Sequence, residues 1–239
     1  MKADDASARA LEGRHVVRAG RPPRALAGEV DERILDAAGK VFIERGFTGA
    51  SVDEIAEAAR AGKLTIYARF PSKEALFNAV IERLARRSTG IEVVSSPGAP
   101  IEDRLEALAT AILTRVLAPE TMGLIRVAVA EARRFPDVAA SVSRMARDRQ
   151  IDAIIRMLSE FTESDPTRAL PAFAPDRLKA AAVRFLNLAV FPMILRALFG
   201  DDLDALNAEI GAHAAESVAF FLAACENREG ACEGELPLD

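Results

Sequence analysis

Apolar residues recur with a helical period from Glu29 onward. One set falls at positions i, i+4, i+7 and i+8, which is the spacing of a single helix face: Ile34, Ala38, Val41 and Phe42. This pattern predicts a helix that ends near Arg45-Gly46, because glycine commonly terminates a helix. Residues 1–28 lack the period and mix charges with glycine and proline, so they are predicted to form a flexible tail; its arginines also fit a segment that lies along a nucleic-acid backbone.

The stretch Ser51–Glu54 reads S-x-x-E, the capping box that opens many helices. The helix that it predicts has one apolar face, formed by Val52, Ile55, Ala56 and Ala59. A turn at Arg60-Ala61-Gly62 ends this helix, and a short third helix is expected over about Lys63–Phe70. Two helices joined by a tight turn that contains glycine form a helix-turn-helix, whose second helix enters the major groove of DNA.

A fourth helix is predicted after Pro71, because proline cannot continue the third. Ser72 is its expected N-cap, and apolar residues recur along its inner face: Leu76, Phe77, Val80 and Leu84. Residues 88–100 then form a loop. Long helical patterns follow at about 101–117, 120–134, 137–163, 176–199 and 203–224. Asp176 and Asp202 stand where the N-caps of the last two helices are expected.

The predicted fold is all-α, since neither a pair of strands nor an internal repeat stands out. A helix-turn-helix DNA-binding domain over residues 29–88 is followed by a larger helical bundle over residues 100–225 and by a flexible tail at 226–239. Aromatic residues make up only 5% of the chain and tryptophan is absent, a composition that favours helices over a β-sandwich.

Charge is distributed unevenly along the chain. Residues 1–90 hold 16 Lys and Arg against 13 Asp and Glu, a net charge of +3, whereas the whole chain carries −5. Within residues 60–90 the cations are Arg60, Lys63, Arg69, Lys73, Arg83, Arg86 and Arg87. The N-terminal part is therefore expected to meet a polyanion, although the chain as a whole is acidic.

Several functional classes find little support. The sequence contains no GxGxxG, P-loop, GxSxG or HExxH motif, so no enzyme is expected. Cys225 and Cys232 lack zinc-ligand spacing and are predicted to be free thiols, and His15 and His213 stand alone; no metal or cofactor is expected. No uninterrupted apolar run reaches the roughly 18 residues of a membrane span, and no secretory signal opens the chain, so a cytoplasmic protein without membrane contact is expected.

The third helix carries candidate chemistry for double-stranded DNA. Ile66 and Phe70 are four residues apart and are expected to face the core, with Thr65 at the margin. This orientation turns four residues outward: Lys63, Leu64, Tyr67 and Ala68. Ser51 and Lys73 begin the flanking helices, where backbone N–H groups and the helix dipole favour anions.

The outward side chains suit different parts of a DNA duplex. Lys63 can reach a phosphate or a guanine edge, and Leu64 or Ala68 can contact a thymine methyl group. Tyr67 places a hydroxyl group at phosphate distance. On spacing alone, the same features also fit a small helical domain with an ordinary polar face.

Residues 29–84 resemble the N-terminal domain of TetR-type transcriptional repressors. The likeness runs through ILDAAGKVFIERGFTGASVDEIAEAA and KLTIYARFPSKEALFNAVI, with GF before the capping box, K-x-T-[LI]-Y-x-x-F in the third helix and SKEAL after it. The resemblance implies that Tyr67 and Lys73 contact phosphates. It also places four residues on the reading helix: Lys63, Leu64, Thr65 and Ala68.

A second resemblance concerns the C-terminal half. The segment MGLIRVAVAEARRFPDVA, residues Met122–Ala139, resembles the AefR-like class of C-terminal domain in this family, and RFLNLAVFPMILRALFG fits a later helix less closely. It implies a homodimer formed through the last two long helices and an effector pocket within the bundle. The protein is thus expected to be a repressor that releases a palindromic operator when it binds a small molecule. Because no cation cluster marks the C-terminal core, we expect an apolar or amphipathic effector rather than a phosphorylated one.

The turn departs from the family pattern. Family members usually read close to AGVSKGTLY where this chain reads ARAGKLTIY, so Arg60 replaces the turn glycine, Gly62 the capping serine and Leu64 a glycine on the reading face. If position 60 needs a positive φ, arginine costs about 1–2 kcal/mol there. The other possibility is a turn rebuilt around Gly62. The altered turn also supports an alternative function, a protein-interaction module that does not read an operator.

Two further sets of residues have both a structural and a functional interpretation. EARRFP, Glu131–Pro136, is interpreted as a helix C-terminus whose arginines meet the negative end of the dipole, or as part of a ligand site or switch. The phenylalanines of the C-terminal half are expected in the core, in the dimer interface or around a pocket: Phe161, Phe173, Phe185, Phe191, Phe199, Phe220 and Phe221.

Overall fold

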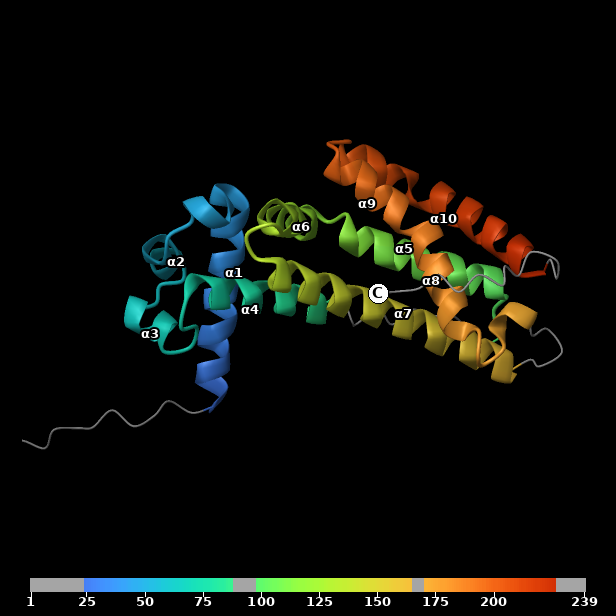
Figure 1. Cartoon of the computed structure of the whole chain (residues 1–239), viewed down its shortest axis with the longest axis horizontal. Helices are drawn as coiled ribbons and strands as arrows, with labels where there is room; N and C mark the ends of the chain where they lie inside the picture. Colours follow the sequence, from blue (N-terminus) through green and yellow to red (C-terminus); the bar gives the residue numbers. More distant parts are fainter. Residues whose placement is uncertain (1–23, 88–97, 165–169, 227–239) are drawn as a thin grey trace, which may run out of the picture.

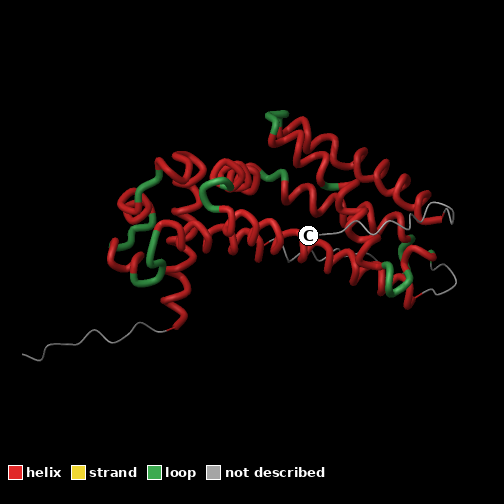
Figure 2. Tube along the Cα trace, viewed as in Figure 1, coloured by secondary structure: helices red, strands yellow, loops and turns green. Residues whose placement is uncertain are grey.

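The computed structural model describes residues 24–87, 98–164 and 170–226, and most of them are helical (Figures 1 and 2). The N-terminal helices are α1 (Arg24–Gly49), α2 (Val52–Ala58), α3 (Lys63–Tyr67) and α4 (Lys73–Arg87). The C-terminal elements are α5 (Ile101–Val116), α6 (Pro119–Glu131), α7 (Pro136–Ser164), the short 3-10 helix η2 (Pro171–Phe173), α8 (Leu178–Ala189), α9 (Phe191–Leu198) and α10 (Leu203–Glu226). No strand occurs within the described ranges, which confirms the predicted all-α fold.

The N-terminal domain packs α1, α2, α3 and α4 around one core. The predicted inner face of α1 is buried: Ile34, Ala38, Val41 and Phe42. At the centre, the ring of Phe77 from α4 lies 5.1 Å from that of Phe42 and 5.2 Å from that of Phe47, centroid to centroid. Ile55 of α2 and Ile66 of α3 complete the cluster. The outer faces of α2 and α3 are thereby turned to solvent at the end of the molecule remote from the bundle (Figure 1).

The ends of α1 differ from the sequence pattern. The helix begins at Arg24, earlier than the expected start at Glu29, so the last residues of the predicted tail are helical. Near Gly46 the prediction is close, because this residue has φ 69° and ψ 170° and breaks the helical geometry before one more turn. The remainder of that tail, the residues after Glu226 and most of the loop predicted at 88–100 lie outside the described residues.

In the C-terminal bundle, α10 lies along α5 and α7 lies against α8 (Figure 1). The core between them contains four of the phenylalanines noted in the sequence: Phe161, Phe173, Phe185 and Phe221. The ring of Phe185 packs edge-on against that of Phe221, with 5.2 Å between centroids. The other three, Phe191, Phe199 and Phe220, are exposed on α9 and α10.

The single helix predicted over 176–199 is wrong, because the structure divides it at Val190 into α8 and α9. Pro192 has no N–H group and so cannot continue the hydrogen bonding of α8. The carbonyl oxygen of Ala189, at the break, accepts a hydrogen bond of 3.0 Å from Nε2 of His213 on α10. His213, which has no neighbouring ligand residues in the sequence, therefore joins two helices.

The two predicted aspartate caps have different outcomes. Asp202 accepts a hydrogen bond of 2.9 Å from the backbone N–H of Ala205, as expected for the N-cap of α10. Asp176 is not a cap, since α8 begins only at Leu178 and its N-cap residue is Arg177, which makes no capping bond through its side chain.

The two domains meet where α6 crosses α1. A Cβ atom added to Gly123 of α6 would lie 3.0 Å from Cγ2 of Ile43, so the helices approach within a distance that leaves no room for a larger residue without movement. The next residue, Leu124, is buried in the core of the N-terminal domain. A helix of the bundle therefore completes the hydrophobic core of the neighbouring domain.

The segment EARRFP joins the same two domains. The hydroxyl group of Thr48 donates to Oε1 of Glu131 at 3.3 Å and accepts from Nη1 of Arg134 at 3.1 Å. The ring of Phe135 lies 4.8 Å from that of Phe47. The helix does end here, at Glu131, but Arg134 contacts the end of α1 in addition to any interaction with the dipole of its own helix.

Two apolar stretches stand out by composition. Judged by length and composition alone, two stretches could cross a membrane: Leu178–Leu198, which combines α8 and α9, and Leu203–Glu226, which is α10. The bent pair α5–α6 is also long and apolar enough when its two helices are taken together. Isolated polar residues interrupt each stretch, so neither contains an uninterrupted apolar run of the length that a membrane span needs.

Candidate nucleic-acid interface

Ser51 begins α2 as its N-cap. Its hydroxyl group accepts a hydrogen bond of 3.1 Å from the backbone N–H of Glu54, which is half of the predicted capping box. The side chain of Glu54 pairs instead with Arg45, with 3.1 Å between Nε and Oε1. The start of α2 is thus fixed both by its own cap and by an ion pair to α1.

The outward face of α3 agrees with the helical period. Ile66 is buried and Phe70 packs against the core, so Thr65 is partly exposed at the margin. The exposed residues are Lys63, Leu64, Tyr67 and Ala68. Leu64 is 87% exposed and Tyr67 is 41% exposed. Both side chains are therefore accessible to another molecule that approaches this face of α3.

Lys63 is held by the preceding helix. Its Nζ lies 2.8 Å from Oδ1 of Asp53, and the hydrogen bond to this carboxylate raises the pKa of Lys63. Both side chains are largely exposed, so solvent weakens the interaction. In the free protein the ammonium group at the start of α3 is thus paired, and contact with DNA would require exchange of this partner.

Lys73 stands at the first position of α4 and reaches back to the connection between α1 and α2. Its Nζ donates to the carbonyl oxygens of Ala50 at 2.9 Å and Thr48 at 3.4 Å, and it lies 4.7 Å from the ring centroid of Phe47. Ser72 caps α4 as predicted, accepting from the backbone N–H of Ala75 at 3.1 Å. The sequence indicated a phosphate role for Lys73 but did not reveal this internal one.

The positive region predicted over residues 60–90 is smaller than the count of its cations suggests. Arg83 is buried and its Nη1 lies 2.7 Å from Asp36 and 3.0 Å from Glu32, both on α1. Arg69 forms an ion pair with Asp31. These two arginines therefore join α3 and α4 to α1 and do not contribute free charge to a DNA-binding surface.

The turn between α2 and α3 could, from the sequence, either hold Arg60 at a positive φ or be rebuilt around Gly62. Arg60 has φ 48°, in the left-handed region, whereas Gly62 has φ −69° and is the N-cap of α3. The turn is therefore not rebuilt around Gly62. Two hydrogen bonds close it, from the N–H of Arg60 to the carbonyl of Glu57 at 3.0 Å and from that of Ala61 to Ala56 at 2.9 Å. These are the two bonds of a Schellman motif, with arginine at the position that glycine usually occupies.

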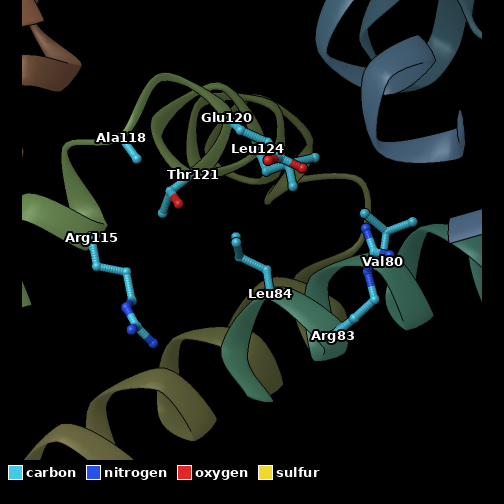
Figure 3. A pocket seen from close by; sticks show the side chains of 8 residues that line it. All are labelled: Val80, Arg83, Leu84, Arg115, Ala118, Glu120, Thr121 and Leu124. Atoms are coloured by element: carbon cyan, nitrogen blue, oxygen red, sulfur yellow. The ribbon is translucent and has the colours of Figure 1, made fainter. Parts of the chain in front are cut away.

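A pocket of about 250 Å³ lies between α4 and the α5–α6 connection (Figure 3). Its apolar lining consists of Val80, Leu84, Ala118 and Leu124, and its polar lining of Arg83, Arg115, Glu120 and Thr121. Figure 3 shows Arg115 and Arg83 on opposite sides of Leu84. The pocket is thus at the junction of the two domains rather than in the centre of the bundle, and it is amphipathic.

The thiol of Cys225, near the end of α10, is unpaired, and Cys232 lies outside the described residues. Burial raises the pKa of Cys225 to about 11. Among the described side chains, no three of His, Cys, Asp or Glu gather as metal ligands.

Comparison with known families matches both halves of the chain. Residues 34–80 match the model described as bacterial regulatory proteins of the tetR family, and residues 103–226 match that of the AefR-like transcriptional repressor C-terminal domain. The regulator SrpR of Pseudomonas putida is 35% identical over 101 residues, which cover 42% of this chain and 46% of SrpR. The match thus spans about half the length of that relative.

Solved structures resemble the chain over most of its length. A putative TetR-family regulator from Mesorhizobium loti superimposes with a TM-score of 0.71 at 26% identity, over 82% of this chain and 96% of that one. The flavonoid-responsive regulator FrrA gives a TM-score of 0.60 at 32% identity, over 84% of this chain and 99% of FrrA. The likeness therefore includes both domains and their connection.

Proposed function

Because this chain belongs to the TetR family of bacterial DNA-binding transcriptional regulators, we propose that it is a homodimeric repressor that a small amphipathic molecule releases from a palindromic operator. Members of this family are regulators and not enzymes, as the lack of catalytic motifs predicts. The repressor role rests on the match of the C-terminal half to a model of repressors. The observation that best supports operator binding is the exposed α3, with Leu64 and Tyr67 outward. A protein of this kind acts beside DNA, so we propose that it is cytoplasmic.

Operator contact is assigned by position on the helix-turn-helix. We propose that α3 enters the major groove, where Leu64, Thr65 and Ala68 meet base edges. Tyr67 and Lys73 lie at the flanks and bind phosphates, as does the start of α2 at Ser51. Leu64 is the largest apolar side chain on this face, so a thymine methyl group is its best partner.

The dimer proposal rests on the large apolar side chains that are exposed on α9, on its C-cap residue and on α10, together called the apolar patch of α9 and α10: Phe191, Leu195, Phe199 and Phe220. Phe199 is 86% exposed and Leu195 51%, which is unfavourable for a monomer in water. Two copies that place this patch face to face would bury it in an isologous interface. The same pairing accounts for the membrane-like hydropathy of α8–α9 and α10 without a membrane, because a helix between a core and a partner is apolar on two sides.

We place the effector in the interdomain pocket. Its apolar lining suits the body of a small molecule, while Thr121, Glu120 and Arg115 offer polar contacts. The charge of Arg83 is already balanced by two carboxylates, which argues against a phosphorylated ligand. FrrA is named a flavonoid-responsive regulator, and an amphipathic aromatic molecule of that class fits the chemistry of this pocket.

Release follows from the position of the pocket. A ligand between α4 and α6 contacts the helix that ends the DNA-binding domain and the helix that completes its core. A ligand that favours a different angle between them shifts the dimer toward states whose two α3 helices no longer match successive major grooves. Operator affinity then falls without any contact between ligand and DNA.

A gel-shift assay with the DNA upstream of the protein's own gene tests the proposal. We expect a complex at nanomolar protein that survives an excess of random duplex and is lost on addition of the effector. The alternative, an interaction module, predicts no complex. The interaction module was suggested by the atypical turn. In the structure, however, Arg60 adopts the left-handed conformation that the turn requires, and α3 still exposes its outward face. The gel shift therefore decides between them.

The effector class is tested by thermal shift with a panel of aromatic amphipathic compounds and a matched panel of phosphorylated metabolites. Binding to the native state raises the melting temperature. We expect only compounds of the first panel to do so, and Leu84→Arg, which places a charge in the pocket, to abolish the shift. Stabilisation by phosphorylated metabolites alone would refute the proposed class.

A further inference from the structure

Arg60 occupies a backbone conformation that costs free energy. A left-handed φ brings the Cβ atom close to the following carbonyl oxygen, so L residues other than glycine rarely adopt it. The neighbouring Gly62, which would have tolerated this conformation, lies in the extended region instead. Glycine at position 60 would form the same two turn hydrogen bonds without strain. The strained arginine is thus not explained by the structure of the turn itself.

The side chain of Arg60 also has no bonding partner among the described residues. Within the described part of the chain, its guanidinium group makes no hydrogen bond or ion pair, and the residue is exposed. Two nearby cations do have partners. Lys63 forms an ion pair with Asp53, and Nε of Arg33 donates a hydrogen bond of 2.7 Å to the carbonyl oxygen of Ala59. Arg60 therefore contributes a positive charge at the α2–α3 turn that no group among the described residues neutralises.

The position of the turn indicates the partner. In a helix-turn-helix the first helix crosses the DNA backbone while the start of the second enters the groove. Residue 60 lies between these two points, two residues before the N-cap of α3. With α3 in the groove, the phosphates that border the groove are therefore anions that its guanidinium group can approach.

We infer that Arg60 is an additional DNA-contacting residue, which binds a backbone phosphate beside the groove entered by α3, and that its strained conformation is retained for this contact. The inference rests on the proposed DNA binding. A phosphate contact adds affinity for any duplex and carries no sequence preference. It also carries a specific expectation: stability and DNA affinity respond to position 60 in opposite directions.

Arg60→Gly tests both sides at once. Relief of the left-handed strain should raise the melting temperature by about 2–4 °C. Loss of one phosphate contact from each subunit should reduce the slope of log affinity against log salt by roughly two units, and should weaken binding roughly 50-fold at 0.1 M salt. Both measurements use the intact dimer, with the DNA upstream of its gene and a random duplex as probes.

Two further variants make the result specific. Arg60→Lys keeps the charge and the strain, and should retain the wild-type melting temperature and salt slope. Lys40→Ala removes an exposed cation on α1 one turn before Ile43, which packs on α6, so it should leave the salt slope unchanged. A wild-type slope for Arg60→Gly would overturn the inference, as would equal losses for Arg60→Lys or Lys40→Ala. If wild-type protein itself fails to bind either duplex, the proposed DNA binding is what fails.

Discussion

The ammonium group of Lys73 donates a 2.9 Å hydrogen bond to the carbonyl oxygen of Ala50, immediately before the residue that caps α2. The first residue of α4 thus holds the start of α2 in place. A side chain that the family resemblance assigns to phosphate binding also stabilises the free protein. Substitutions at this site are expected to change stability and DNA binding together.

Lys73→Met tests the structural role of Lys73 and its phosphate binding by two separate measurements, the free energy of unfolding and the salt slope of DNA affinity. The change keeps an unbranched apolar chain near the ring of Phe47 but removes the charge and the hydrogen bond to Ala50. We expect the free energy of unfolding to fall by about 1–2 kcal/mol, as is typical for a hydrogen bond from a charged donor. If Lys73 also binds phosphate, the salt slope of DNA affinity should decrease by roughly two units per dimer. Lys73→Arg, which retains the charge, serves as the control, and an unchanged slope for Lys73→Met would limit Lys73 to its internal role.

Leu64→Ala should lower affinity for the operator and leave binding to random duplex unchanged. The side chain is exposed in the free protein, so the melting temperature should not change.

Tyr67→Phe should weaken binding to both duplexes without altering the salt slope, because a hydroxyl group releases no counterion. Competition gel shifts with the two duplexes measure this difference. An equal, uniform loss for both variants would mean that α3 does not enter the groove as proposed.

Leu195→Glu should convert the dimer to monomers, since it places a charge within the apolar patch of α9 and α10. Sedimentation at micromolar concentration measures the change. Val129→Glu is the matched control, because Val129 is an exposed apolar residue on α6 outside that patch and its replacement should leave the dimer intact. A wild-type protein that is already monomeric in the same experiment would contradict the proposed interface.

Thr48→Val should loosen the contact between the two domains. It removes the hydroxyl group that joins Glu131 and Arg134 while nearly preserving volume. Loss of two exposed hydrogen bonds should cost about 1 kcal/mol and lower the melting temperature by about 2–4 °C. Thr114→Val, at an exposed position of α5, is the control and should have little effect. Equal melting temperatures for the two variants would show that this contact contributes no stability.

Cys225 should be slow to react in the native protein. Burial raises its pKa to about 11, and the thiolate is the nucleophile, so reactivity should increase as pH rises toward that value. In a Cys232→Ser background, where Cys225 is the remaining cysteine, alkylation at pH 8 should be at least roughly tenfold slower than after unfolding. Equal rates before and after unfolding would contradict the assigned environment.

Local sequence rules were sufficient for the elements that depend on neighbouring residues. Ser51, Ser72 and Asp202 cap their helices as expected, because an N-cap bonds to an N–H group within three residues of itself. The outward face of α3 also follows from the sequence, since the helical period that buries Ile66 must expose Leu64. These features together predicted the exposed face of α3, which we propose reads DNA.

Where several local signals conflict, the sequence was less informative. Apolar residues continue across 176–199 and suggested one helix, but Pro192 removes a hydrogen-bond donor and the chain divides at Val190. The position of Asp176 also suits a cap, yet α8 starts later. Composition favoured helix at both sites; hydrogen bonding and packing determined where each helix begins and ends.

Contacts between distant segments were decided only by the tertiary structure. Arg83 is one of the cations that the sequence placed in the positively charged region, but α1 and α4 pack together and bring its guanidinium group to Asp36 and Glu32. The dual role of Lys73 and the pocket between α4 and α6 likewise depend on how the helices are assembled. Helical period and capping are properties of adjacent residues, so the sequence by itself determined most of the helices, three of their caps and the exposed face of α3. The partner of each charge depends on residues far apart in the chain, and folding alone brings these together.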